Sequence, residues 1–448
     1  MENKYDLTTG PVRSTMIRFV LPYLLSCFLQ TFYGMADLFV VGLYNGSATT
    51  SAVSIGSQVM HMLTVMIVGL AMGATVEIGH DVGAGDTSRA KKTVGTTVIA
   101  FAVLAVLLTL LLLALTAPIT QVMMTPKAAL PDTLSYLKIC FAGIPFVVAY
   151  NVICSVYRGA GDSKSPMIFV GIACFVNVVL DFVFIGGCAM GASGAALATV
   201  IGQAVSAIIA LAMMGKIGLG FRIEKKDIAF NGSILSKIFK VGVPISMQDG
   251  LIQIAFIVIT VIANSRGTTV SASVGIVEKM ISFMFLVPSA FLSAISAITA
   301  QNMGAGKAER ARESLRFGLF VTFFWGLFCC ILCQLFPESF VGIFSKDSAV
   351  ILAGAQYLRA YVIDAMFAAI HFCFSGYFCG DQKSGISFLH NIVSVVAVRV
   401  PGAYLASRYF PDTLFPMGLA APMGSLLSVL ICVGFYVYYG KKERVFYG

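Results

Sequence analysis

Long runs of apolar residues, separated by short polar segments, recur along the whole chain of 448 residues. Each run is about 20 residues or longer, which is the length an α-helix needs to cross a bilayer, and the alternating pattern of membrane β-strands does not recur. The pattern therefore predicts an all-α integral membrane protein. We expect twelve transmembrane helices, near residues 15–42, 51–78, 92–116, 133–157, 166–186, 191–214, 236–263, 270–300, 315–336, 350–378, 385–406 and 414–439.

The composition agrees with a membrane protein. Hydrophobic residues make up 58% of the chain and charged residues only 11%, whereas soluble proteins carry about 25% charged residues. No small-residue cleavage site follows the first apolar run. We therefore expect this run to be the first spanning helix and not a removable signal peptide.

Basic residues lie mostly in the polar segments on one side of the predicted membrane. These segments include "RAKK" at 89–92 and the central segment 216–240, whereas the opposite segments hold only Lys127, Arg266, Lys346 and Arg408. Because cytoplasmic loops are enriched in Lys and Arg, both termini are predicted to be cytoplasmic in a multi-pass protein of the cell (inner) membrane. The same loops explain the net charge of +9, so no nucleic-acid partner is expected.

The chain contains an internal repeat. The segment "VGAGDTSRAKKT" at 82–93 recurs as "MGAGKAERARES" at 303–314, which is 221 residues later, and Pro22 of the first run is matched by Pro244 of the seventh. A repeat of six spans keeps both copies in the same orientation, as in transporters built from parallel repeats. We expect an N-terminal six-helix lobe at 1–215, a cytoplasmic linker at 216–235 and a C-terminal six-helix lobe at 236–448.

Four polar residues of the first half lie within apolar runs. Asp37 is near the outer end of the first run, Asn177 and Asp181 lie in "FVNVVLDFVFIGG", and Thr199 lies in the sixth run. At a rise of 1.5 Å per residue, Asp37, Asp181 and Thr199 sit about 8–12 Å below the outer surface. Asn177 and Asp181 are four residues apart, so their side chains share one helical face.

No basic residue lies at this depth in the same three runs. Two carboxylates without a cation between them cannot both be comfortably ionised, so they would share a proton or bind a cation such as Na⁺. The four residues are therefore a candidate proton- or cation-binding site. The alternative is that each one only hydrogen-bonds a neighbouring helix.

The second half has acids and bases in balance. Glu278 is followed by Lys279, and Asp364 and Arg399 lie in the tenth and eleventh runs. Buried ion pairs explain these residues as well as a second ion site does.

Three further positions within the apolar runs stand out. Gln248 and Asp249 in the seventh run are candidates for a second ion site or for contacts with cationic substrates. Pro22 is predicted to bend the first helix, because proline leaves a carbonyl of the preceding turn without its partner. Asp81, at the inner end of the second run, is predicted to lie at a solvated helix end.

Five segments in order resemble the multidrug and toxic compound extrusion (MATE) family. They are "GLAMGATVEIGHDVGAGDTSRAKK", "YRGAGDSKSPMI", "NVVLDFVFIGG", "GASGAALATVIGQ" and "ITAQNMGAGKAERA". The resemblance covers nearly the whole chain. It implies a bacterial, V-shaped transporter of two six-helix lobes, which exchanges H⁺ or Na⁺ for amphipathic, often cationic drugs by alternating access.

The resemblance also implies roles for particular residues. In the DinF-like branch the cation site uses positions that match Asp37, Asn177, Asp181 and Thr199, and the bending proline matches Pro22. In the NorM-like branch the acids of helices 7 and 10 match positions about one turn from Asp249 and Asp364, which puts a second ion site in doubt.

Two other functions are weighed against an antiporter. A flippase for a lipid-linked oligosaccharide, from the same superfamily, would need a strongly cationic cavity for pyrophosphate, and few basic residues lie at membrane depth. An enzyme is not expected, because the motifs of metallopeptidases, serine hydrolases and nucleotide-binding loops are missing and the 11 Cys and 4 His lack metal-ligand spacing. We expect a monomer in the lipid bilayer that needs no cofactor beyond its coupling ion.

Overall fold

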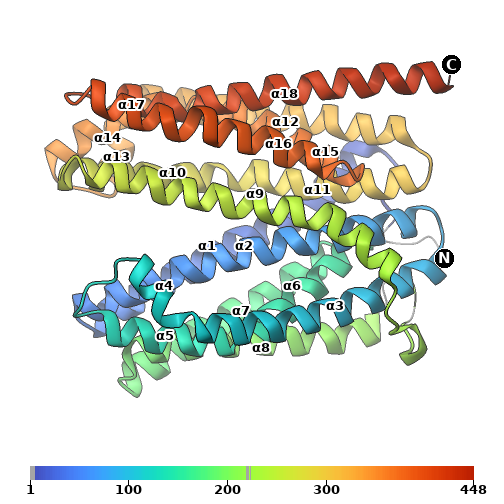
Figure 1. Ribbon diagram of the computed structural model, residues 1–448, viewed down its shortest axis with the longest axis horizontal. Coiled ribbons are helices and arrows are strands. Elements are labelled where there is room, and N and C mark those ends of the chain that lie inside the picture. The colour runs from blue at the N-terminus through green and yellow to red at the C-terminus, as the bar shows by residue number, and fades with distance from the viewer. Residues whose placement is uncertain (1–5, 218–220, 222, 448) are drawn as a thin grey trace. The chain divides into compact units, whose positions relative to one another are not determined.

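The computed structural model describes residues 6–217, 221 and 223–447, and all regular elements within these residues are helices (Figure 1). Of the predicted linker, residues 218–220 and 222 lie outside the described residues. The first half of the chain forms α1 (Val12–Tyr44), α2 (Ser47–Gly83), α3 (Thr87–Ala114), α4 (Thr116–Val122), α5 (Leu130–Ala142), α6 (Ile144–Gly159), α7 (Lys164–Asp181), the π-helix η1 (Phe182–Gly187) and α8 (Gly191–Ile217). After the 3₁₀ turn η2 (Lys225–Asp227), the second half forms α9 (Gly232–Asn264), α10 (Thr268–Met284), α11 (Leu286–Gly304), α12 (Ala308–Leu335), α13 (Pro337–Gly342), α14 (Ser348–Tyr361), α15 (Asp364–Gly380), α16 (Ser384–Ser394), the π-helix η3 (Val395–Arg399), α17 (Val400–Tyr409) and α18 (Phe415–Tyr447).

The described residues contain ten helices that are long and apolar enough to cross a membrane, or twelve if each of two bent helix pairs is one span. The bent pairs are α5 with α6, at 48°, and α14 with α15, at 43°. The twelve predicted runs match these spans, and their ends differ by a few residues at most of the helix ends. The chain is therefore a multi-pass membrane protein of the predicted all-α class.

The two bends occupy equivalent places in the internal repeat. Gly143 separates α5 from α6, and a side chain there would collide with the Val200 side chain. Pro145, in the first turn of α6, cannot continue a helix from α5 without losing a hydrogen bond. The residue 221 positions after Gly143 is Asp364, which begins α15.

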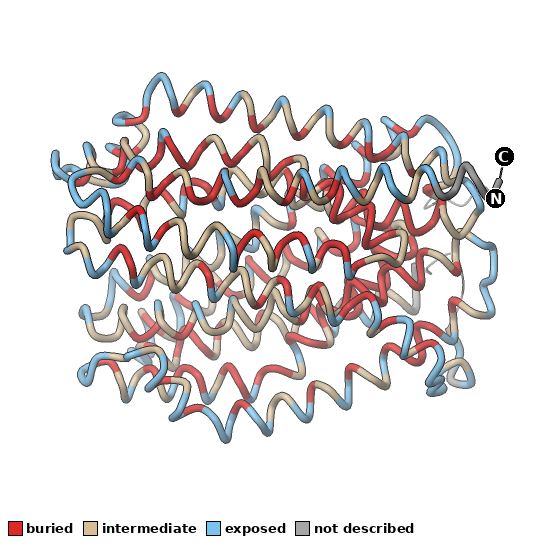
Figure 2. The backbone as a smooth tube through the Cα atoms, turned by 45° about the horizontal axis from the view of Figure 1, so that its top comes forward, coloured by how far each residue is buried: buried red, intermediate tan, exposed pale blue. Residues whose placement is uncertain are grey.

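Many large apolar side chains are exposed along the long helices. In α3, Leu107 and Leu110 are 59% and 63% exposed, and in α12, Phe320 and Phe324 are 62% and 51% exposed. Figure 2 shows exposed positions recurring along the lengths of the helices, with buried positions between them. Soluble monomers rarely expose apolar surface on this scale, whereas lipid covers it in a membrane protein.

The chain forms two compact units. The first unit (the N-unit) comprises Ile17–Ser246 with Ala300–Gly306 and the described part of Met1–Gly10, and the second (the C-unit) comprises Met247–Thr299 and Lys307–Gly448 with Pro11–Met16. The predicted division placed the boundary in the linker. In the structure the first half of α9 and the last turns of α11 group with the N-unit.

Glycines allow these segments to approach α2 closely within the N-unit. A side chain at Gly73 would overlap the carbonyl oxygen of Ile238 in α9, and one at Gly83 would overlap that of Gln301 in α11. In the reverse direction, a side chain at Gly304 would overlap the backbone of α2 at His80. Gly83 and Gly304 are equivalent in the repeat, so the same glycine serves both sides of the α2–α11 contact.

Candidate functional site

The structure brings together the four polar residues predicted to form a cation site. Asp37 comes from α1, Asn177 and Asp181 from the end of α7, and Thr199 from α8. Asp37, Asn177 and Asp181 are only 4%, 2% and 0% exposed. Thr199 is half-buried. The site therefore lies inside the N-unit, as three helices that converge on one polar spot.

Small residues of α8 allow it to pack tightly on α7. Gly202 faces α7, and a Cβ atom there would lie 3.1 Å from the carbonyl oxygen of Ala173 and 3.3 Å from the Cβ of Asn177. Ala195 and Ala198, on the same stretch of α8, are fully buried. A larger residue at position 202 would push Asn177 away, so glycine at this position sets the spacing of the site.

The hydroxyl of Thr199 links the three helices. It donates a hydrogen bond to Asp37 Oδ2 (3.1 Å) or to the carbonyl oxygen of Ala195 (3.0 Å), since it has only one hydrogen, and it accepts one from Asn177 Nδ2 (3.5 Å). The carboxyl of Asp181 lies within hydrogen-bonding reach of that of Asp37. Two carboxyl groups can form such a bond only when one of them carries a proton.

The site has more buried acceptors than donors. Within the described part of the chain, no donor pairs with Asp37 Oδ1, with Asn177 Oδ1 or with either carboxylate oxygen of Asp181. No Lys or Arg of the described residues forms an ion pair with either aspartate. A buried acceptor without a donor costs about 1–3 kcal/mol, and a buried charge costs more. A proton or a hard cation would satisfy these oxygens.

The helix geometry changes at the site itself. Asp181 is the last residue of α7, and the π-helix η1 begins at the next residue. π-helical turns are uncommon and often occur at functional sites, because they redirect side chains and weaken the regular hydrogen bonding of the backbone. This feature has no clear signature in an apolar run, so the sequence did not reveal it.

Two further polar residues extend the site toward the inner side. Gln203 Nε2 donates to the hydroxyl of Tyr33 at 3.5 Å, and Gln203 Oε1 is buried with no donor among the described residues. Tyr33 lies four residues before Asp37, and Gln203 lies four residues after Thr199. The sequence analysis missed this pair, although the four-residue spacing on both helices was a usable signal.

Pro22 lies within α1, which continues through it from Val12 to Tyr44. The Pro22 carbonyl accepts a hydrogen bond from the Ser26 hydroxyl at 3.0 Å. The next residue, Tyr23, lies beneath the Arg158 guanidinium of α6, which is 5.6 Å from the ring centroid. The bending role of Pro22 stays a prediction.

The acid of α15 in the C-unit has a basic partner. Asp364 is fully buried, and its Oδ2 accepts a hydrogen bond from Arg399 Nη2 at 2.8 Å. The same nitrogen donates to the Ser425 hydroxyl at 3.0 Å, and Ser425 lies 3.4 Å from His371 Nε2. Of the two readings of Asp364, the geometry matches the buried ion pair.

The other C-unit candidates do not join this ion pair through any contact between the described residues. Gln248 Oε1 accepts a hydrogen bond from the Ser387 hydroxyl at 2.8 Å, and the half-buried Asp249 contacts Gln248. Glu278 contacts Thr260, and its buried Oε1 has no donor among the described residues. Their roles as ion or substrate contacts stay predictions.

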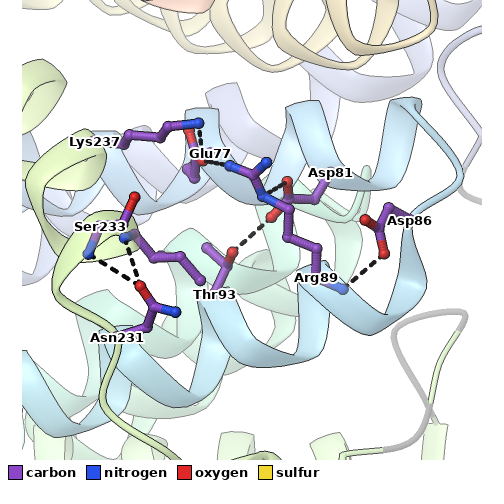
Figure 3. A network of polar contacts seen from close by, with 9 residues as sticks. Glu77, Asp81, Asp86, Arg89, Thr93, Asn231, Ser233 and Lys237 are labelled. Carbon is purple, nitrogen blue, oxygen red and sulfur yellow. Dashed lines mark hydrogen bonds and ion pairs between the residues drawn. The ribbon is translucent and has the colours of Figure 1, made fainter.

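An ion-pair network lies at the inner end of α2 (Figure 3). Arg89 of α3 binds Glu77 at 2.7 Å and Asp81 at 2.9 Å, while Lys237 of α9 lies 3.8 Å from Glu77. Thr93 also donates to Asp81 at 2.6 Å. The expectation of a solvated helix end was wrong for Asp81, which is only 4% exposed, because α3 folds back over α2.

A model of the MatE family matches the chain twice, at residues 22–183 and 244–405. The two matches cover well over half of the chain. The chain belongs to the MatE family. Both matches begin at a proline of the repeat, Pro22 and Pro244, and together they confirm that the MatE chain is duplicated.

Relatives of this MatE chain match over nearly its full length. The chain is 25% identical over 452 residues to the Probable multidrug resistance protein YoeA of Bacillus subtilis (strain 168), covering 96% of this chain and 95% of that protein. It is 27% identical to the Probable multidrug resistance protein NorM of Thermotoga maritima, covering 89% and 86%. It is 24% identical to the Multidrug export protein MepA of Staphylococcus aureus (strain N315), covering 96% and 95%.

Solved structures share the MatE fold. A MATE protein crystallised in complex with MaL6 superimposes with a TM-score of 0.92 at 20% identity, covering 99% of this chain and 100% of that chain. A MOP superfamily transporter from Pyrococcus furiosus, described by a reverse polarity of its binding pocket, gives 0.90 at 21% identity, covering 96% of each chain. At these identities the likeness establishes the fold, including the predicted two-lobe class, and nothing about the site.

Proposed function

We propose that this MatE chain is a secondary active multidrug efflux antiporter, which exchanges H⁺ or Na⁺ for amphipathic, often cationic organic compounds by alternating access. The names of its relatives, multidrug resistance and multidrug export proteins, support efflux of small molecules. The observation that carries the coupling half of the proposal is the acid-only cluster of the N-unit, with its unpaired buried oxygens.

The proposed coupling ion binds at Asp37, Asn177, Asp181 and Thr199. With one proton, Asp181 and Asp37 share a hydrogen bond and only one negative charge stays buried. With Na⁺, the carboxylate, amide and hydroxyl oxygens supply the ligands that a hard cation takes. Losing the ion leaves two buried carboxylates facing each other, and the resulting repulsion favours a different arrangement of α1, α7 and α8.

Coupling requires that the ion and the drug differ in their preference for two states of the transporter. An ion with equal affinity for both states would shift nothing. Loss of the ion from Asp37 and Asp181 changes the packing of α1, and Pro22 provides a point where this helix can bend. The drug would bind best to the state with the empty, negatively charged site, so ion binding releases it.

The proposed substrate contacts lie in the C-unit. Glu278 and Asp249 are acids without a basic partner among the described residues, and a cationic drug could pair with either. Gln248 offers an amide next to Asp249. Aromatic residues make up 12% of the chain and include 35 Phe, which suits an apolar surface that repacks around different drugs.

The proposed setting follows from the loop charges. Both termini face the cytoplasm of a bacterial inner membrane, and the protein works as a monomer without ATP or another cofactor. An inward gradient of H⁺ or Na⁺ then loads the site from outside and drives export.

The test uses purified protein in liposomes and follows the efflux of a fluorescent cationic dye under a pH gradient or a Na⁺ gradient, imposed separately. Wild-type protein is expected to export dye under one gradient, which names the ion. Asp37→Asn and Asp181→Asn are expected to show no gradient-driven export. Asp132→Asn is the matched control, because Asp132 is an acid of the N-unit that only accepts a hydrogen bond from Thr49 at the start of α2.

Two outcomes contradict the proposal. Normal gradient-driven export by Asp181→Asn, with folded protein in the membrane, would remove the cation site from these residues. An absence of dye export by wild-type protein under both gradients would favour the flippase for a lipid-linked oligosaccharide, which the same liposomes can test with a labelled lipid.

A further inference from the structure

A pocket opens at one end of the C-unit, where α12 begins and where α15 and α18 end. Its volume is about 390 Å³, within the range of small-ligand sites. Its walls combine basic residues with tyrosines. These helix ends lie on the side that the proposed orientation assigns to the cytoplasm, and the inference rests on that orientation.

The lining of the pocket carries an excess of positive charge. Its charged members are four basic and two acidic side chains: Arg312, Arg316, Lys383, Lys441, Glu309 and Asp381. The single carboxylate of Glu309 is shared by two guanidinium groups, with Arg312 at 3.1 Å and Arg316 at 3.1 Å. One carboxylate neutralises only one of them. Arg316 is 64% exposed, so it can turn toward an incoming anion.

Aromatic rings form the rest of the wall and hold Lys383 in place. The Lys383 ammonium lies 4.3 Å from the Tyr439 ring centroid and 2.6 Å from Asp381. Tyr377 and Tyr436 pack edge to face, with ring centroids 5.7 Å apart. Tyrosines are enriched at the level of lipid headgroups, where one end of the ring is apolar and the other is wet. The pocket therefore suits a ligand that sits at the membrane surface.

An apolar stripe continues from the pocket along α12. Phe320, Phe324 and Phe328 follow Arg316 at intervals of four residues, so they share its helical face. They are 62%, 51% and 54% exposed, and the rings of Phe320 and Phe324 are 4.7 Å apart. A ligand with its charge at Arg316 and an apolar tail would lie along this stripe. A free phosphate ion would leave the stripe unused.

We propose that this pocket binds the phosphate ester of an anionic phospholipid from the cytoplasmic leaflet, with Arg316 and Lys441 on the phosphate and an acyl chain along Phe320, Phe324 and Phe328. The phosphate oxygens accept hydrogen bonds from the guanidinium that Glu309 does not neutralise. Basic pockets between helices at the cytoplasmic surface bind anionic headgroups in this way. The site is separate from the cation site and belongs to the other compact unit.

The test measures lipid binding to the purified full chain by native mass spectrometry, and the temperature midpoint of unfolding in detergent. The probes are phosphatidylglycerol, phosphatidylcholine and soluble glycerol 3-phosphate. Phosphatidylglycerol is expected to bind and to raise the midpoint, and the other two are not. Each basic residue near a membrane surface contributes about 1 kcal/mol, so Arg316→Gln/Lys441→Gln should bind phosphatidylglycerol about 25-fold more weakly.

Two variants make this result specific. Lys346→Gln/Arg408→Gln removes two exposed basic residues from the opposite end of the C-unit and should bind as the wild type does. Arg316→Lys/Lys441→Arg keeps both charges and should retain most of the affinity, which separates loss of charge from misfolding. Unchanged binding in Arg316→Gln/Lys441→Gln would overturn the proposal. Equal binding of glycerol 3-phosphate would overturn the lipid as the source of the phosphate.

Discussion

The two halves of the chain share a fold but differ in how they treat a buried acid. In the N-unit, Asp37 and Asp181 face each other with no basic partner among the described residues. In the C-unit, Asp364 is held by Arg399 at 2.8 Å. The repeat places Ile259 and Gly402 where the N-unit has Asp37 and Asp181, so the duplicated fold did not duplicate the site.

This difference separates a site that can change charge from one that cannot. An ion pair keeps both partners charged over the physiological pH range, so it contributes to one fixed packing. Two facing carboxylates must gain or lose a cation, and each change alters the charge inside the helix bundle. The comparison therefore assigns switching to the N-unit and a structural role to the Asp364–Arg399 pair.

The largest expected effect is the loss of coupling when the N-unit acids are neutralised. Asp181→Asn should reduce gradient-driven efflux by about 5- to 150-fold, the usual span of coupling between two sites. Replacing the C-unit pair as a whole, Asp364→Leu/Arg399→Met, should leave coupling intact. Efflux in liposomes under the effective gradient measures both variants, and equal losses would erase the distinction between the two units.

A second effect concerns stability and appears in the opposite unit. Asp364→Asn should lower the free energy of unfolding by about 3–5 kcal/mol, because Arg399 then stays buried without its partner. The double change Asp364→Leu/Arg399→Met should recover most of this loss. Denaturant titration in detergent measures both. A neutral Asp364→Asn would show that the ion pair is not a structural element.

A third prediction sharpens the geometry of the N-unit site. Gly202→Val should cost about 1–3 kcal/mol through overpacking, and it should weaken ion binding because it displaces Asn177. Gly187→Val is the matched control, since a side chain there would meet nothing within 4 Å. Titration with the coupling ion measures the affinity. Equal affinities in the two variants would contradict a site whose spacing depends on Gly202.

The smallest effect is expected in the network at the inner end of α2. Lys237 is 46% exposed and lies 3.8 Å from Glu77, so Lys237→Gln should change the free energy of unfolding by less than about 1 kcal/mol. Arg89→Gln should cost more, because it leaves the buried Glu77 and Asp81 close to each other. A larger loss in Lys237→Gln than in Arg89→Gln, measured by the same denaturant titration, would contradict this order.

The spans and the cation site could be predicted from the sequence because both follow from one-dimensional rules. Apolar runs give the helices, and counting 1.5 Å per residue from the ends of the runs places Asp37, Asp181 and Thr199 at one depth. Three helices of one bundle with polar residues at one depth have few other ways to bury them. The two halves were also visible, because the segments at 82–93 and 303–314 repeat.

The remaining features depend on contacts that a pattern does not record. The bend at Gly143 is set by Val200 of another helix, and the burial of Asp81 is set by Arg89 and Thr93 of α3. The grouping of the end of α11 with the N-unit follows from the backbone contact at Gly83 and Gly304. None of these leaves a periodic trace within its own apolar run.

The most direct test of the account counts the ions displaced when a cationic drug binds. Purified protein in weakly buffered detergent solution is mixed with the drug, while a pH electrode follows protons and a ²²Na⁺ assay follows sodium. The account predicts release of H⁺ or Na⁺ by the wild type and by Asp364→Leu/Arg399→Met, and no release by Asp181→Asn. Undiminished release by Asp181→Asn would contradict the claim that the N-unit acids hold the coupling ion.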